Sequence, residues 1–143
     1  MPDLSRFIPP QDDTFAEALA EIRAGRKTSH WIWWVFPQLA SLGVSDHARF
    51  YGLSGLGEAR DYLAHPLLGP RLLEASRAML AHQGREAADI LGELDAKKLR
   101  SCATLFAALD DAPPEFAQVL DAFFGGEADA RTLQLLDPQR VAT

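Results

Sequence analysis

The sequence predicts an all-α fold, a compact single-domain bundle (residues 1–143) of about seven to eight short and medium helices with no sheet. Apolar side chains recur at spacings of three and four residues along most of the chain, as they do on the buried face of a helix. Glycine, proline and capping residues divide these stretches at short intervals. One segment, residues 31–36, is rich in strand-favouring residues, but the chain offers no second such segment with which it could pair.

The first helix is expected to begin at Asp12 or Asp13, whose carboxylates can accept hydrogen bonds from the first free backbone amides. Gly25 stands where a residue in the left-handed conformation would end this helix. Residues 1–11 contain two adjacent prolines and little periodicity, so they are expected to form an irregular lead-in.

All three tryptophans lie in residues 26–38, next to a basic pair, two hydroxyls, a histidine and a side-chain amide. We expect a helix here, because the aromatic side chains include pairs spaced four apart, Thr28 or Ser29 can cap the helix and Pro37 would stop it. A strand is the competing interpretation, since Trp, Ile, Val and Phe all favour sheets. We favour the helix because a strand would have no partner.

The rest of the chain is expected to form helices that are separated by glycine, proline and capping residues. They are a short helix capped by Ser45, a helix at 54–65, one at 67–82, a short piece at 86–91, one at 96–109, one that begins at Pro113 and Pro114, and a last one capped by Asp129. The tail, residues 137–143, has little to bury and is expected to be loose.

Composition argues against several classes of function. The net charge of −6 and the isoelectric point near 5.1 argue against a nucleic-acid binder that neutralises many phosphates. The lone Cys102 excludes an internal disulfide and a cysteine-based zinc site, and it fits a reducing compartment. No signal sequence and no apolar run of about 18 residues is present, so we expect a cytoplasmic protein without a membrane partner.

Two basic and hydroxylated clusters predict anion binding in this acidic protein. Lys27 and Ser29 precede an expected helix N-terminus, where free amides and the helix dipole favour a negative group. Lys98 and Ser101 belong to a second basic face, within residues 97–104. The competing interpretation is structural, with basic side chains that satisfy carbonyls at a helix end or solvate a face. No glycine-rich nucleotide-binding loop is present.

The same region suggests chemistry. His30 stands beside Ser29, and an imidazole can accept the proton of a hydroxyl within hydrogen-bond reach. The alternative is a structural His30 that bonds a backbone carbonyl. Trp33 and Trp34 are expected in the core, whereas Trp31 lies on another side of the helix and could stack on a planar ligand. No two of the four histidines are three or four residues apart, so a metal site is not expected, because its ligands would have to converge from separate helices. No cofactor is expected either.

Three stretches of the sequence resemble the signature of a known family. They are Lys27-x-Ser29-His30-Trp31-x-Trp33-x-x-Phe36-Pro37-Gln38, Glu58-Ala59-x-x-Tyr62-Leu63-x-His65-Pro66-x-Leu68-Gly69-x-Arg71-Leu72, and Gly92-x-x-Asp95-x-x-Lys98-Leu99-x-Ser101-x-x-Thr104-Leu105-Phe106. On these residues the chain is similar to a bacterial family of unknown function, catalogued as domain of unknown function 1810 and sometimes mislabelled calpastatin. The resemblance covers nearly the whole chain.

The resemblance implies a small, single-domain, all-helical fold without an established biochemical role. It also singles out Lys27, Ser29, Arg71, Lys98 and Ser101 among the basic and hydroxylated residues.

These observations lead to two hypotheses of different classes. The first is a cleft that binds a small anionic ligand. A nucleotide-like molecule is one candidate for this ligand, and both binding alone and catalysis on the bound ligand are considered. In it, catalysis would fall to His30 and Ser29, and the ligand-binding residues would be Lys27, Trp31, Gln38, Arg71, Lys98 and Ser101. The second is a protein-interaction module without catalytic activity, which would use apolar surface around Phe123 and Phe124. The sequence does not indicate an oligomeric state.

Overall fold

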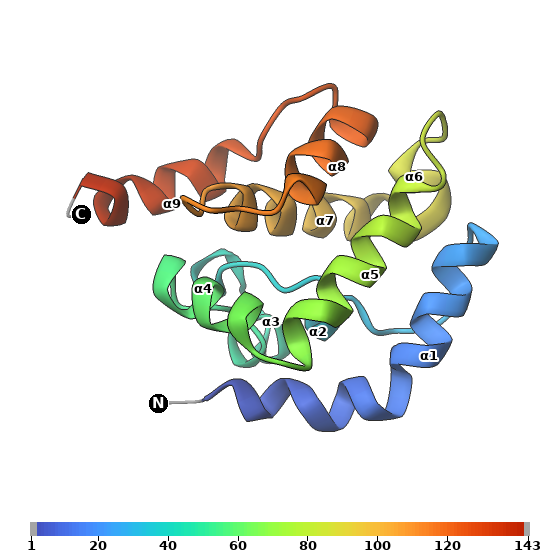
Figure 1. Cartoon of the computed structure of the whole chain (residues 1–143), viewed down its shortest axis with the longest axis horizontal. Coiled ribbons are helices and arrows are strands. Elements are labelled where there is room, and N and C mark those ends of the chain that lie inside the picture. The colour runs from blue at the N-terminus through green and yellow to red at the C-terminus, as the bar shows by residue number, and fades with distance from the viewer. Residues whose placement is uncertain (1–2, 142–143) are drawn as a thin grey trace.

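Helices make up the regular structure of the chain, as the sequence predicts (Figure 1). The computed structural model describes residues 3–141, with side chains described for residues 3–136. This part of the chain is one compact domain of nine α-helices and two 3-10 helices, and it contains no strand. A single parallel bridge joins Leu39 to Leu53. None of the described helices is long and apolar enough to cross a membrane.

The helices follow one another with short connections. In chain order they are η1 (Leu4–Phe7), α1 (Ile8–Ala24), α2 (Ile32–Val35), η2 (Ala40–Leu42), α3 (Asp46–Phe50), α4 (Leu56–Ala64), α5 (Leu68–Leu80), α6 (Ala87–Leu91), α7 (Glu93–Ala107), α8 (Pro114–Phe124) and α9 (Ala130–Val141). From α3 to α8 these bounds lie within a few residues of those predicted.

Two helices, α5 and α7, organise the domain. The first contacts α1, α2, α4 and α8, and the second contacts α4, α6, α8 and α9. In Figure 1, α5 crosses diagonally between α1 and the pair formed by α7 and α8. Three fully buried rings join α4, α7 and α8: the ring of Phe106 lies 5.2 Å from that of Phe116 and 5.7 Å from that of Tyr62, measured between centroids. Rings of this size contribute much of the apolar area that stabilises the core.

The prediction of an irregular lead-in over residues 1–11 is wrong. The 3-10 helix η1 and the first turn of α1 occupy most of this segment, and α1 begins at Ile8. Pro9 and Pro10 fall in the first turn, where a missing backbone amide leaves no hydrogen bond unmade. The predicted end of the helix is confirmed, because Gly25 has a φ of 79° and donates its amide to carbonyls of α1.

The tryptophan segment is helical over a single turn. Its helix, α2, spans Ile32–Val35, and neither Thr28 nor Ser29 caps it, since the residue at its N-terminal cap is Trp31. The predicted helix over the whole segment is therefore wrong. Before α2 the chain runs as an irregular loop, whose Lys27 amide donates to a carbonyl of α6 over 2.7 Å.

The last helix is longer than predicted. α9 extends to Val141, so residues 137–141 are helical rather than a loose tail, and residues 142–143 lie outside the described part of the chain. The predicted cap is confirmed: the carboxylate of Asp129 accepts a hydrogen bond from the amide of Thr132 over 2.9 Å.

We expect Gly69→Ala to destabilise the protein by about 1–3 kcal/mol. The added methyl group would overlap the backbone carbonyl of Leu63, which cannot rotate away as a flexible side chain can. The matched control is Gly57→Ala in α4, where no atom lies within 4 Å of the added methyl group. Because alanine favours helices, that change should stabilise the protein by up to about 1 kcal/mol. Urea denaturation measures both, and two equally stable variants would contradict the close approach of α5 to α4.

Candidate functional site

The carboxylate of Glu21, on α1, receives hydrogen bonds from the segment that the sequence predicts to bind an anion. The backbone amides of Thr28 and Ser29 donate to its Oε1 over 2.7 and 3.0 Å. The indole N–H of Trp31 donates to the same oxygen over 2.9 Å, and the Ser29 hydroxyl donates to Oε2. A carboxylate of the protein itself therefore takes up the amides that were predicted to hold an external anion.

Glu21 remains ionised although it is only 9% exposed. Burial alone would raise the pKa of its carboxyl. The hydrogen bonds from the Ser29 hydroxyl, the Trp31 indole and the two amides outweigh burial, and they lower the pKa from an ordinary value of 4.5 to about 2. Glu21 thus carries a full negative charge at neutral pH, and charge-assisted hydrogen bonds attach the loop after α1 to it.

Trp31 is the most deeply buried of the three tryptophans, which corrects its predicted role. It is 1% exposed and its N–H is bonded to Glu21, so its ring is not available to stack on a ligand from solvent. Trp33 and Trp34, predicted to lie in the core, are half-buried and pack against the core from its edge. Helical spacing does not describe the position of Trp31, because this residue precedes α2 and has a φ of −148°.

Lys27 and Lys98 meet at Asp95, near the start of α7. The Nζ atom of Lys27 lies 2.8 Å from Oδ2 of Asp95, and that of Lys98 lies 3.0 Å from Oδ1. Each ammonium also lies over an indole: Lys27 is 5.1 Å from the ring centroid of Trp31, and Lys98 is 4.3 Å from that of Trp33. We call Lys27, Asp95, Lys98 and Trp33 the lysine cluster.

The lysine cluster carries a net positive charge. Burial raises the pKa of Asp95, but its pairing with Lys27 and Lys98 outweighs burial and lowers the pKa, so this carboxyl is ionised at neutral pH. Two ammonium groups therefore face one carboxylate. The side chain of Lys27 is 8% exposed and that of Lys98 is 22% exposed. Lys98 is the cation of the cluster that a dissolved ligand can reach more easily.

Three predicted ligand-binding residues do not join the lysine cluster. Ser101 is buried, and its hydroxyl donates to the carbonyl of Lys97 on its own helix over 3.1 Å. Arg71, on α5, is directed to α1, where its Nη2 lies 3.1 Å from Oδ1 of Asp12. Gln38 is half-buried, and its backbone carbonyl accepts a hydrogen bond from the backbone amide of Leu53, between α3 and α4. Spacing along single helices could not show which elements these residues face.

The two residues with a predicted catalytic role have separate surroundings. The hydroxyl of Ser29 donates to Glu21 and also lies 3.0 Å from Oε1 of Glu17. His30 is exposed, and within the described residues its side chain has no hydrogen bond or ring contact. No Ser29–His30 pair is therefore formed here.

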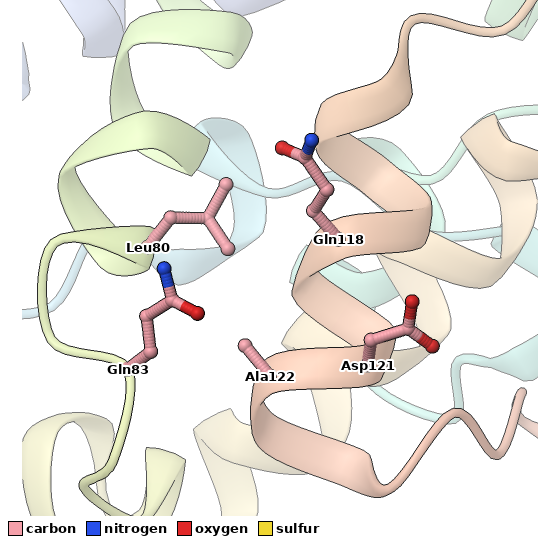
Figure 2. A pocket seen from close by; sticks show the side chains of 5 residues that line it. All are labelled: Leu80, Gln83, Gln118, Asp121 and Ala122. Atoms are coloured by element: carbon pink, nitrogen blue, oxygen red, sulfur yellow. The ribbon is translucent and has the colours of Figure 1, made fainter.

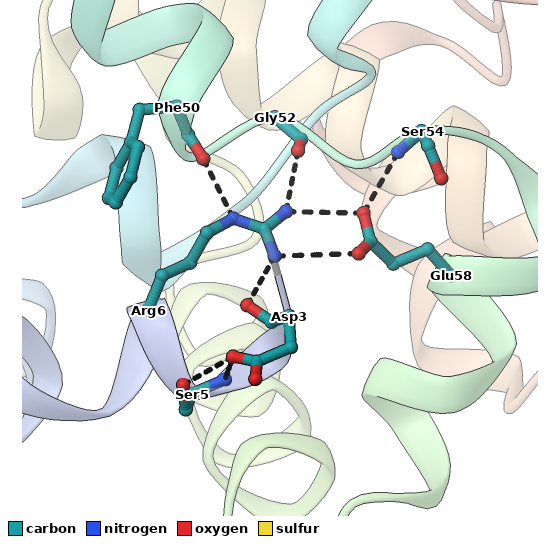
Figure 3. A network of polar contacts seen from close by, with 7 residues as sticks. All are labelled: Asp3, Ser5, Arg6, Phe50, Gly52, Ser54 and Glu58. Carbon is teal, nitrogen blue, oxygen red and sulfur yellow. Dashed lines mark hydrogen bonds and ion pairs between the residues drawn. The ribbon is translucent and has the colours of Figure 1, made fainter. Parts of the chain in front are cut away.

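A second network of buried charge, around Arg6 and Glu58, was not predicted (Figure 3). Arg6 lies 3.1 Å from a carboxylate oxygen of Glu58, donates to the carbonyls of Phe50 and Gly52 over 2.7 and 2.8 Å, and is 5% exposed. The carboxylate of Glu58 also accepts a hydrogen bond from the backbone amide of Ser54. All the N–H groups of this guanidinium are used within the protein, so the network joins η1 to α4. The ion pair spans 52 residues of sequence and leaves no local signal.

Cavities are found at other places on the molecule. One of about 410 Å³ lies between the end of α5 and α8, where Gln83 and Gln118 border it (Figure 2). Another of about 460 Å³ lies between the end of α4 and the connection from α7 to α8, and a third of about 310 Å³ lies on α3. None of these three is lined by a residue of the lysine cluster. Among the described residues, no group of three or more metal-ligating side chains is arranged to hold an ion.

Comparison with known proteins identifies relatives of this fold, and their descriptions name no activity. The model of a family described as protein of unknown function (DUF1810) matches residues 1–136. The chain is similar to the conserved hypothetical protein Rv1873 from Mycobacterium tuberculosis, whose crystal structure is known. The two sequences are 47% identical, the structures superpose with a TM-score of 0.91, and the match covers 94% of this chain and 96% of the other. No curated protein matches the chain.

Glu21→Gln should lower the free energy of unfolding at pH 7 by about 2 kcal/mol, because a neutral amide replaces the charged acceptor of four hydrogen bonds. The folded-state pKa of about 2 lies below the ordinary value of 4.5, so this stabilisation is complete above pH 4.5 and is lost as the pH falls toward 2. Urea unfolding of the wild type and the Glu21→Gln variant measures this effect. The difference between their free energies of unfolding should shrink as the pH falls from 7 toward 2.

Glu17→Gln is the matched control, because Glu17 is exposed and the one hydrogen bond of its side chain within the described residues is with the Ser29 hydroxyl. It should change stability by less than about 0.5 kcal/mol. A Glu21→Gln protein as stable as the wild type at pH 7 would show that this carboxylate does not hold the loop.

Trp31→Ala should cost about 3–5 kcal/mol, as the loss of a fully buried large side chain does. Trp33→Ala should cost less than about 2 kcal/mol, because its ring is already partly in solvent. Guanidinium denaturation of the two variants compares them directly. The reverse order would restore the sequence-based assignment of Trp33 to the core.

Proposed function

We propose that this chain, which belongs to the DUF1810 family of proteins of unknown function, binds a small anionic ligand at the lysine cluster. The observation that carries the proposal is the meeting of Lys27 and Lys98 at one carboxylate. Lys27 alone would neutralise Asp95, so the second ammonium leaves one positive charge without a counterion in the cluster. In a protein with a net charge of −6, such a local excess of positive charge favours the binding of an anion at this place.

The surroundings of Lys98 favour a ligand with a planar group beside its anionic group. Trp33 is half-buried, and its indole ring lies next to the ammonium that is accessible from solvent. It takes the role that the sequence suggested for Trp31. Stacking of a base on an aromatic side chain contributes about 1–3 kcal/mol, so a nucleoside monophosphate suits the cluster better than a bare anion.

The surroundings of Ser29 and His30 favour binding over catalysis. The Ser29 hydroxyl is bonded to Glu21 and serves the loop. His30 is exposed and has no side-chain partner within the described residues, so of the two suggested catalytic residues only His30 is free to move a proton on a bound ligand.

A protein-interaction role is the second candidate, at a different surface from the one predicted. Phe123 and Phe124 are half-buried and pack against the core. Among the residues with described side chains, the large apolar residues that are exposed are Val44 at 88%, Leu94 at 73% and Phe50 at 51%. Two of these lie at or beside α3, so a protein partner would be expected there rather than on α8.

Lys98→Gln should weaken the binding of adenosine monophosphate by at least about tenfold, because it removes the accessible cation. Lys97→Gln removes the same charge from the neighbouring exposed position and should leave the affinity within about twofold. Titration calorimetry at low ionic strength measures both. Each variant should unfold within about 0.5 kcal/mol of the wild type, since Asp95 keeps Lys27 as a partner.

Equal weakening by the two variants would indicate only the general effect of charge and would refute a defined site. If neither adenosine monophosphate nor inorganic phosphate binds to the wild type, the protein-interaction role would be favoured instead. In that case Val44→Ser and Phe50→Ser should abolish whatever association the wild type shows by analytical ultracentrifugation.

A further inference from the structure

The cavity between the C-terminal end of α4 and the connection from α7 to α8 combines an apolar lining with acidic side chains. Its volume of about 460 Å³ is in the range of small-ligand sites, about 300–1,000 Å³. Leu63 lines it from α4, and Leu109 and Pro113 line it from the connection. Asp110 and Asp111 also border it from the connection. Such a cavity can hold a ligand that has an apolar body and one charged group.

The charges at this cavity favour a cation. Asp110 and Asp111 are exposed, and within the described residues neither carboxylate has a hydrogen bond or an ion pair. Arg60 is the basic residue of the lining, so the lining carries two negative charges and one positive charge. The C-terminal end of α4, whose carbonyls carry partial negative charge, belongs to the same wall.

We infer that this cavity binds a small primary ammonium ion with an apolar body, such as an alkylamine or arylalkylamine. The ammonium group would lie between the carboxylates of Asp110 and Asp111, which can accept its N–H groups. The apolar body would lie against Leu63, Leu109 and Pro113 and would be removed from water there. An anionic ligand of the same shape would be repelled by both carboxylates.

This inference is independent of the proposed anion site. The lysine cluster lies at the start of α7 and this cavity lies beyond its end, and a helix of 15 residues is about 22 Å long. The two sites share no residue and favour ligands of opposite charge. Failure of either one leaves the other standing.

The test is a titration of the full chain with 2-phenylethylamine, which is protonated at neutral pH, followed by amide shifts in nitrogen-15 NMR spectra. The neutral analogue 2-phenylethanol has the same apolar body without the charge. Saturable shifts are expected for the amine at residues 63–64 and 109–112, with an affinity at least about tenfold higher than for the alcohol.

Exposed side chains of the cavity allow variants that do not disturb the fold. Asp110→Asn with Asp111→Asn should reduce affinity for the amine at least about tenfold, and Arg60→Gln should increase it, because a competing cation is removed. Asp121→Asn is the matched control, since Asp121 is an exposed aspartate that borders the cavity between α5 and α8. Equal binding of amine and alcohol, full affinity in the double variant, or no saturable shift in the wild type would each overturn the inference.

Discussion

The carboxylate of Glu21 determines the path of the chain between α1 and α2. A buried charge has to be hydrogen-bonded to be tolerated, and Glu21 obtains its partners from residues 28–31. The loop folds back on α1 to bring these donors to the carboxylate. As a result, Trp31 lies in the core and α2 begins only at Ile32. Lys27 precedes these donors directly, and the same path brings it to Asp95 on α7.

Charge pairs between distant elements decide which polar residues remain available for a ligand. Arg6 uses all its N–H groups inside the protein and holds η1 to α4. Lys27 is nearly buried and holds the loop to α7. Lys98 pairs with the same carboxylate as Lys27, but its side chain is 22% exposed and is therefore more accessible than either of the others. A structural role for Asp95 and a binding role for Lys98 are compatible, since one carboxylate cannot neutralise two ammonium groups.

The helix α7 is the frame for both proposed sites. Its buried face, which includes Leu99 and Phe106, is fixed in the core, so the ends of the helix have defined positions. A positive cluster lies at its start and an acidic cavity lies just beyond its end. The Mycobacterium tuberculosis protein shares the fold, and neither its description nor that of the family assigns a reaction.

The all-α class, the approximate positions of the helices from α3 to α8 and local ends such as Gly25 and the cap at Asp129 are predictable from the sequence, because they depend on residues a few positions apart. The sequence also points to Lys27 and Lys98, through the family resemblance and their chemistry. The burial of Trp31 rather than Trp33, the pairing of Arg71 with α1 and the ion pair of Arg6 with Glu58 become visible only in the folded chain. Each of these depends on which elements pack together, and a buried charge selects its partners by proximity in space, which spacing along one helix does not encode.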